Sequence, residues 1–175
     1  APGSGLSKLT SWGNVFYGGA VPADIEALND ITAVYASALA FVARRSDDSF
    51  VAWGGVNYGA KLPDSLKAAP ASTGKRVVHI RGNQAAFVAR LEDQSLVAWG
   101  NEDYGATLPT TADPLTPHDP STSLSQRKDI ATLECTTLQP FSALTSAGRV
   151  VARANPAHGG PVPSTLAPLD ALQQR

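Results

Sequence analysis

The chain has 175 residues and a mass of 18.2 kDa, which is enough for one well-buried core and too little for two ordinary domains of different kinds. Its 14 lysines and arginines nearly balance its 15 aspartates and glutamates, so no basic face is available for nucleic acid. Charged residues make up only 17% of the chain, and the 15 glycines and 13 prolines indicate many short strands joined by tight turns.

The longest uncharged apolar stretch, residues 31–43, is too short to cross a bilayer, so we expect no transmembrane segment. No basic segment followed by an apolar one opens the sequence, so it shows no secretory signal. Cys135 is the only cysteine, which excludes an internal disulfide framework.

An aromatic-glycine pair recurs in the chain, followed four or five residues later by a second such pair. The complete copies are Trp12-Gly13 with Tyr17-Gly18, Trp53-Gly54 with Tyr58-Gly59, and Trp99-Gly100 with Tyr104-Gly105. A weaker fourth copy has Arg153 in place of tryptophan and His158 in place of tyrosine. The copies are roughly 40 to 55 residues apart, a spacing typical of propellers, solenoids and related arrays.

The predicted elements repeat in the same order after each copy. A short helical stretch, such as residues 23–29 or 63–69, should begin with an Asp or Ser cap and point a Leu or Ile inward. Three short strands follow, and a polar turn joins the last two into a hairpin. The expected strands cover residues 30–37, 40–45 and 50–53, then 76–80, 85–91 and 96–99, then 129–134, 141–145 and 149–153.

These elements predict a single repeat domain over residues 1–175, with units at about 17–54, 58–100 and 104–154 and a split unit made of 158–175 plus 6–13. We expect an all-β fold with short helical turns, either a partial or small β-propeller or a pseudo-threefold, trefoil-like barrel. A single unit cannot cover its own apolar face, so neighbouring units must stack. Residues 107–128, rich in Pro, Thr and Ser, are expected to form a mobile surface loop.

The recurring aromatic and glycine residues have a physical explanation. Tryptophan brings a large apolar area to the end of each hairpin, and the glycine after it permits a sharp turn with positive φ. Strict recurrence favours the same packing position in each unit. We therefore expect a structural core role for Trp12, Trp53, Trp99, Tyr17, Tyr58 and Tyr104.

Each unit has the same order of motifs: Ile-x-x-Val, a turn, an aromatic with Ala, a polar turn, and Val-x-Trp-Gly with Tyr-Gly. This order resembles the repeat of the regulator of chromosome condensation family, whose members are β-propellers. The resemblance covers roughly residues 11–160. That family has Asp-Gly in the hairpin turn, where this chain has Asp47-Asp48, Asp93-Gln94 and Ala147-Gly148. The chain is also similar to tryptophan-glycine repeats of large bacterial surface and secreted proteins, which implies a secreted or cell-surface location.

No motif for catalysis, phosphate binding, dinucleotide binding or zinc binding occurs in the sequence, so we expect neither an enzyme nor a cofactor or metal site. The histidines His79, His118 and His158 lie in a strand, the Pro-rich loop and a repeat turn.

The sequence is best interpreted as a non-catalytic binding or adhesion module that recognises a protein or a glycan through its loops. The alternative is a toxin or effector component that acts by oligomerisation or on a membrane or host target, and open strand edges favour association between copies. Two groups of residues are candidates for contact with a partner. The first group lies between Trp-Gly and Tyr-Gly and differs from copy to copy, and the second is a basic position that repeats on a strand. They are Val15, Phe16, Val56, Asn57, Glu102 and Asp103, together with Arg44 and Arg90.

Overall fold

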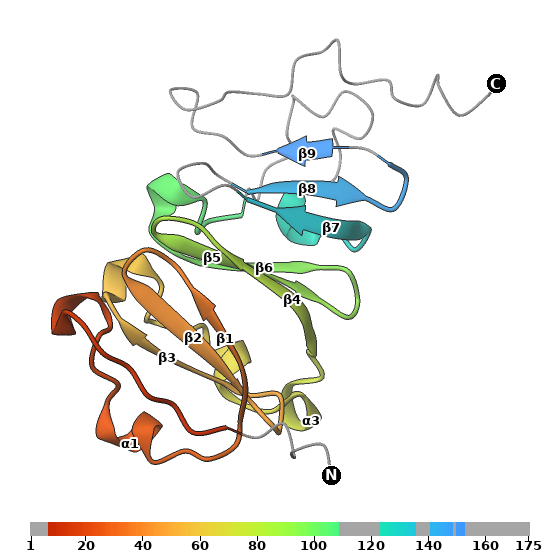
Figure 1. The fold of residues 1–175 in the computed structure, drawn as a ribbon. Helices are drawn as coiled ribbons and strands as arrows, with labels where there is room; N and C mark the ends of the chain where they lie inside the picture. The colour runs from red at the N-terminus through yellow and green to blue at the C-terminus, as the bar shows by residue number, and fades with distance from the viewer. Residues whose placement is uncertain (1–6, 109–122, 136–140, 149, 153–175) are drawn as a thin grey trace.

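The computed structural model describes residues 7–108, 123–135, 141–148 and 150–152. Its strands form three separate antiparallel sheets that follow one another along the molecule (Figure 1). Within each sheet the strands stand in chain order, which confirms the predicted repeat of three-stranded sheets. Sheet A contains β1 (Ile31–Ala36), β2 (Ala40–Arg45) and β3 (Phe50–Gly54); sheet B contains β4 (Val77–Gly82), β5 (Ala86–Leu91) and β6 (Leu96–Gly100); sheet C contains β7 (Ile130–Glu134), β8 (Ser142–Thr145) and β9 (Val150–Ala152).

The three sheets are not joined edge to edge into a barrel, so the trefoil-like alternative was wrong. The first strands of the sheets are neighbours, since β1 lies beside β4 and β4 beside β7. Gly82 permits this approach, because a Cβ atom there would lie 2.3 Å from the Ala36 carbonyl oxygen. The arrangement is that of successive blades in a partial β-propeller.

Short helices connect the strands. They are the 3-10 turns η1 (Val15–Tyr17), η2 (Val56–Tyr58), η3 (Glu102–Tyr104) and η4 (Leu124–Gln126), and the α-helices α1 (Ala23–Glu26), α2 (Asp64–Lys67) and α3 (Pro70–Thr73). Helices α1 and α2 confirm the predicted helical stretches, and each buries one apolar side chain, Ile25 or Leu66. The predicted Asp or Ser caps were wrong. Pro22 and Pro63 precede these helices without a side-chain cap, because the fixed φ of proline already leads the extended chain into the first turn.

The apolar core lies between the sheets. Because side chains alternate across a strand, β5 points Phe87 and Ala89 toward sheet A and Ala86 and Val88 toward sheet C. The cluster between sheets A and B also contains Leu66 of α2. Every unit therefore completes its neighbour's core, as the repeat predicted.

The hairpin turns keep a left-handed residue at the position where the family repeat has glycine. Asp48 has φ 64°, Gln94 has φ 63° and Gly148 has φ 77°. The backbone of this turn is thus conserved between the three units although only the third unit has the glycine that favours it.

Residues near both ends of the predicted mobile loop 107–128 pack onto the cluster between sheets B and C. Leu108 and Leu124 lie against that cluster and Ser123 is buried. Residues 109–122 lie outside the described part of the chain, as does the 158–175 half of the predicted split unit. Among the described residues, no helix is long and apolar enough to span a membrane.

Candidate binding rim

The turns η1, η2 and η3 lie along one side of the row of sheets, where Figure 1 shows them in red, yellow-orange and green. The turns η2 and η3 follow the last strands of sheets A and B, and η1 follows the extended segment that ends at Trp12. We call these three turns the rim. All six residues predicted from the variable positions of the turns lie on it: Val15, Phe16, Val56, Asn57, Glu102 and Asp103.

A repeated set of hydrogen bonds fixes the backbone of the rim. Asn14 Oδ1 accepts from the Phe16 amide at 2.9 Å, and Asn101 Oδ1 accepts from the Asp103 amide at 2.9 Å. Gly55 replaces the asparagine in the middle turn. Each turn closes on a glycine in the left-handed region, a conformation that side-chain-bearing residues adopt at a cost.

Two further bonds tie the later turns to the sheets. Ser37 Oγ donates to the Tyr58 carbonyl at 3.0 Å, and Asn83 Nδ2 donates to the Tyr104 carbonyl at 2.8 Å. Each donor lies in the turn between the first two strands of the sheet that directly precedes the tyrosine's 3-10 turn. The rim is therefore held by the scaffold on which it stands.

Tryptophans fix the turns from the other side. Trp53 Nε1 donates to the Gly18 carbonyl at 3.1 Å, and Trp99 Nε1 donates to the Gly59 carbonyl at 3.0 Å. Both indoles are buried, and each stacks on the phenylalanine of the neighbouring strand. The glycine that closes one turn is thus held by the tryptophan of the next sheet.

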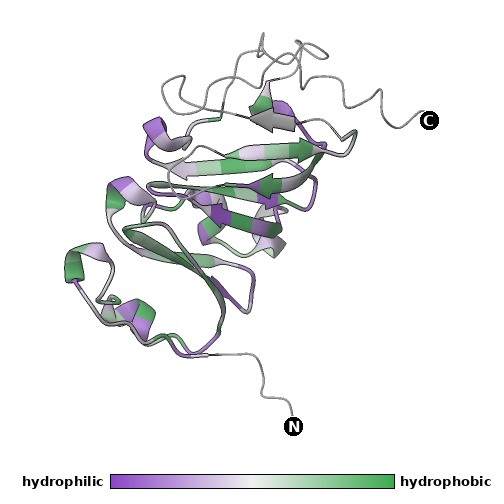
Figure 2. Ribbon diagram, turned by 45° about the horizontal axis from the view of Figure 1, so that its top comes forward, coloured by the Kyte–Doolittle hydropathy of each residue, from purple (hydrophilic) through white to green (hydrophobic). Residues whose placement is uncertain are grey.

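The exposed side chains of the rim change character along its length. The first turn presents Val15 and Phe16, and the ring of Phe16 is 80% exposed. The middle turn presents Val56 and Asn57, and the last presents Glu102 and Asp103. Figure 2 shows the same change, with green on η1 and purple on η3. The rim runs from an apolar end to an acidic end on one constant backbone frame.

Two aromatic residues assigned to the core lie on the surface instead. Trp12 is 85% exposed and Tyr17 is 55% exposed. Both belong to the first copy, and the described residues include no phenylalanine strand beside Trp12 of the kind that covers Trp53 and Trp99. The first copy carries the same local motif as the other two, so the motif alone gave no signal of this difference. Tyr58 and Tyr104 are partly buried and pack against the clusters of sheets A/B and B/C.

The structure does not bring Arg44 and Arg90 to the rim. Both lie beside the hairpin turns, at the opposite end of their sheets, where Arg44 pairs with Phe50 and Arg90 with Leu96. Arg44 Nε donates to Asp48 Oδ1 at 2.7 Å, and Arg76 Nε donates to Asp48 Oδ2 at 3.1 Å. The Asp48 carboxylate therefore joins the turn of sheet A to the segment that leads into sheet B.

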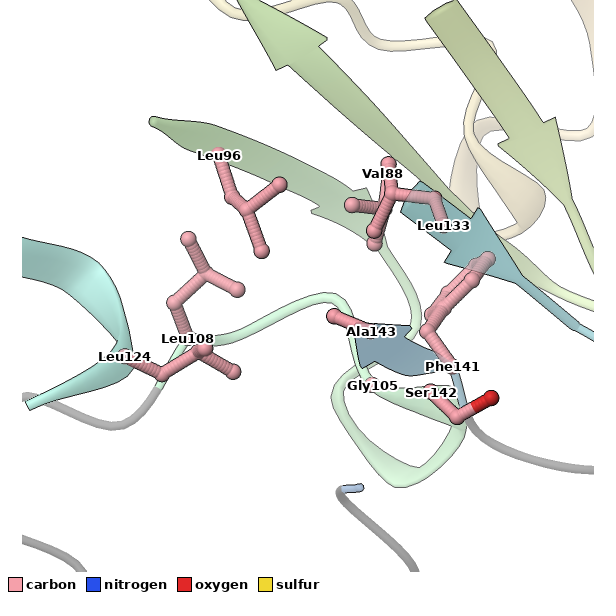
Figure 3. A pocket seen from close by; sticks show the side chains of 9 residues that line it. All are labelled: Val88, Leu96, Gly105, Leu108, Leu124, Leu133, Phe141, Ser142 and Ala143. Carbon is pink, nitrogen blue, oxygen red and sulfur yellow. The ribbon is translucent and has the colours of Figure 1, made fainter. Parts of the chain in front are cut away.

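An apolar pocket lies between sheets B and C, lined by Leu96, Leu108, Leu124 and Phe141, with Ser142 at its edge (Figure 3). Its volume is about 20 Å³, which holds about one water molecule and no organic ligand. We interpret it as a gap in packing between sheets.

Groups that titrate do not form a reactive cluster in the described part of the chain, where no three His, Cys, Asp or Glu side chains gather to hold a metal. His79 lies on β4, and burial lowers its pKa below the ordinary histidine value. Burial likewise raises the pKa of the Cys135 thiol, whose Sγ donates to the Gly82 carbonyl at 3.3 Å. His118 and His158 lie outside the described residues.

No protein-family model matches the sequence, and no curated protein matches it either. Solved structures of β-propellers do resemble it. Prp20p of Saccharomyces cerevisiae superposes with a TM-score of 0.50 and 16% identity over 87% of this chain and 43% of its own length. Yeast RCC1 (Prp20) in complex with Kap60 superposes with a TM-score of 0.48 and 17% identity over 77% of this chain and 33% of its own length. Human WBSCR16 superposes with a TM-score of 0.49 and 17% identity over 81% of this chain and 38% of its own length.

The likeness to Prp20p shows the fold, a small partial β-propeller, and these structural neighbours are repeat proteins of the regulator of chromosome condensation type. The chain spans less than half the length of each of these propellers.

Proposed function

We propose that this chain is a protein-binding repeat module and that the rim is its contact surface. The observation that carries the proposal is the pair Val15 and Phe16, exposed on a turn whose backbone is fixed by hydrogen bonds. Exposed aromatic residues on a rigid frame lose little conformational freedom on binding, and aromatic anchors dominate the energy of protein interfaces.

The character of the rim defines the partner. Its apolar end needs an apolar pocket, and Glu102 and Asp103 at the other end need basic side chains. A partner with a hydrophobic pocket flanked by lysines or arginines fits both ends at once. We infer a protein partner in preference to a glycan, since the exposed side chains of Val15 and Phe16 present apolar area without the array of hydrogen-bonding groups that sugars require.

The structural neighbour is consistent with this role. Prp20p has binding properties toward Gsp1p and histones. That likeness extends to the fold alone, so it supports the choice of a binding scaffold and does not select the partner.

The test is affinity capture with the intact chain and three variants. The double variant V15S/F16S should lose the captured protein, and V78S should retain it, because Val78 is 47% exposed on β4 at the other end of the sheet. The double variant E102Q/D103N should bind more slowly and with less dependence on salt. Circular dichroism of each variant checks that the fold is kept.

Equal capture of the partner by V15S/F16S and by V78S would contradict the proposal. Binding of the intact chain to sugars on a glycan array through the same residues would contradict it as well. The second result would favour the glycan alternative.

A further inference from the structure

His79 lies at the junction between sheets B and C. In the register of sheet B it pairs with Arg90 of β5, and Arg81 pairs with Val88. Paired residues of antiparallel strands share a face of the sheet, and Val88 belongs to the cluster that sheets B and C form together. The side chains of His79, Arg81 and Arg90 therefore face sheet C.

The imidazole of His79 is partly buried, and its Nε2 atom is fully buried without a hydrogen-bond partner. Among the residues that the structure describes, no other buried side-chain nitrogen or oxygen is left in this state. Buried polar atoms in folded proteins are nearly always hydrogen-bonded, so this exception calls for an explanation. The neutral ring tolerates the site, but a charged ring would carry an N–H donor where water does not reach it.

The charged groups that face His79 oppose a positive charge on its ring. Arg81 lies on the same strand and Arg90 on β5, and both are cations. The carboxylate on this side of the junction is that of Glu134 on β7, and its Oε2 lies 3.7 Å from Arg81 Nε. Glu134 therefore already faces one cation before His79 takes up a proton.

The equivalent arginine of sheet A is better compensated. Arg44 forms an ion pair with Asp48 in the hairpin turn, whereas Gln94 stands at the matching position of sheet B. Arg90 thus has no carboxylate in its own hairpin turn to balance the charge that it places beside His79.

These surroundings determine the sign of the pH effect. Burial lowers the pKa of His79, and the charges of Arg81 and Arg90 lower it further against a smaller opposite effect of Glu134. Where the sheets part, water reaches the ring and its pKa returns to the ordinary value of about 6.5. The closed junction therefore has its full stability above about pH 6.5 and loses stability as the pH falls below that value.

We propose that the junction between β4 and β7 is a pH-sensitive joint, closed at neutral pH and opened when His79 takes up a proton. The junction between sheets A and B has Ala33 at the equivalent place, paired with Arg44. Mild acid therefore separates sheet C from sheet B and leaves the packing of sheet A on sheet B unchanged.

Cys135 reports on this opening. It is the only thiol of the chain, it follows β7 directly, and its Sγ reaches across the junction to the Gly82 carbonyl of β4 at 3.3 Å. The probe is dithiodipyridine, which reacts with thiols at acidic as well as neutral pH. The reaction rate of the folded chain is divided by that of the urea-unfolded chain at the same pH, and we expect this ratio to rise about threefold or more from about pH 7.5 to about pH 5.5.

Three variants identify the group responsible. H79Q keeps a polar side chain without the titration, so its ratio should stay constant with pH. R90Q removes a cation beside His79, so the rise should be smaller, and the matched variant R44Q in sheet A should keep the full rise. Comparing R90Q with R44Q tests the proposal without any change at His79.

Hydrogen exchange locates the opening. Over the same pH range the protection factors of β7 amides, corrected for intrinsic exchange, should fall while those of β2 stay constant. A ratio that does not change with pH would overturn the proposal, as would a rise that H79Q shows in full or that R90Q and R44Q share equally. An equal fall in protection in β2 and β7 would also overturn it, because acid would then destabilise the whole molecule and not one junction.

Discussion

Trp53 and Trp99 each connect three parts of the structure through one side chain. The ring of Trp99 stacks on Phe87 of the adjacent strand, its indole nitrogen donates to the Gly59 carbonyl, and its surface lies in the cluster between sheets A and B. A buried carbonyl that loses its hydrogen-bond donor has neither that donor nor water as a partner, so the free energy of the folded state rises. The Trp-Gly recurrence is thus explained by a hydrogen bond as well as by apolar area.

Replacing Trp99 by phenylalanine tests this account. W99F keeps an aromatic ring but removes the donor to Gly59 and part of the packed volume, so we expect a loss of about 2 kcal/mol in the free energy of unfolding. The matched variant W12F should change it by less than about 0.5 kcal/mol, since that ring is exposed. Urea denaturation with an unchanged slope measures both. Equal losses in the two variants would show that the indole hydrogen bond and burial are unimportant.

At the scale of residues, predictions from the sequence were correct where a residue recurs together with the strands that pack around it. Gly54 and Gly100 have the positive φ expected of them, and Ile25 and Leu66 point inward. Trp12 has the same motif around it, yet its burial depends on strands that the motif does not contain. A short motif predicts the local backbone, and burial is decided by the neighbouring sheet.

At the scale of elements, the hairpin turns show that a left-handed backbone conformation can occur without the glycine that favours it. Asp48 and Gln94 occupy the left-handed region at positions where glycine would be free of strain. Asp48 has a compensating role, because its carboxylate accepts from Arg44 and from Arg76 of the next unit. The left-handed conformation at these positions could not be predicted from Asp and Gln alone, although the family repeat indicated it.

The two turns respond differently to glycine. Q94G should raise the free energy of unfolding by about 0.5 to 1 kcal/mol, because the strain of a left-handed glutamine exceeds the added freedom of glycine in the unfolded chain. D48G relieves the same strain but removes two ion pairs, so it should gain less or lose stability. Thermal unfolding compares the variants, and a lower Tm for Q94G would refute the strain argument.

For the whole molecule, the position of a sheet in the row determines how well it is covered. Sheet B has clusters on both faces, and five of the six residues of β5 are buried. The prediction of three stacked units was confirmed because stacking follows from apolar residues on both faces of each middle strand. The orientation of the variable turns along one rim, and the opposite placement of Arg44, required the strand register that only the structure provides.

Hydrogen exchange should reveal this order. The amides of β5 should exchange most slowly, and those of β2 and β8 faster, because five of the six residues of β5 are buried but only half of the residues of β2 and β8 are. Mass spectrometry of peptic fragments at neutral pH measures the three strands side by side. Equal protection in all three would mean that the row of sheets opens only as a single cooperative unit.

The bond between the indole of Trp99 and the carbonyl of Gly59 also bears on how such a chain can grow. Both halves of that junction, and everything between them, lie in one continuous stretch of sequence. A gene segment that encodes this stretch, copied in tandem by recombination, would carry both the donor and the acceptor of its own hydrogen bond. Chains of different repeat number can therefore arise by duplication or deletion without a new contact having to evolve.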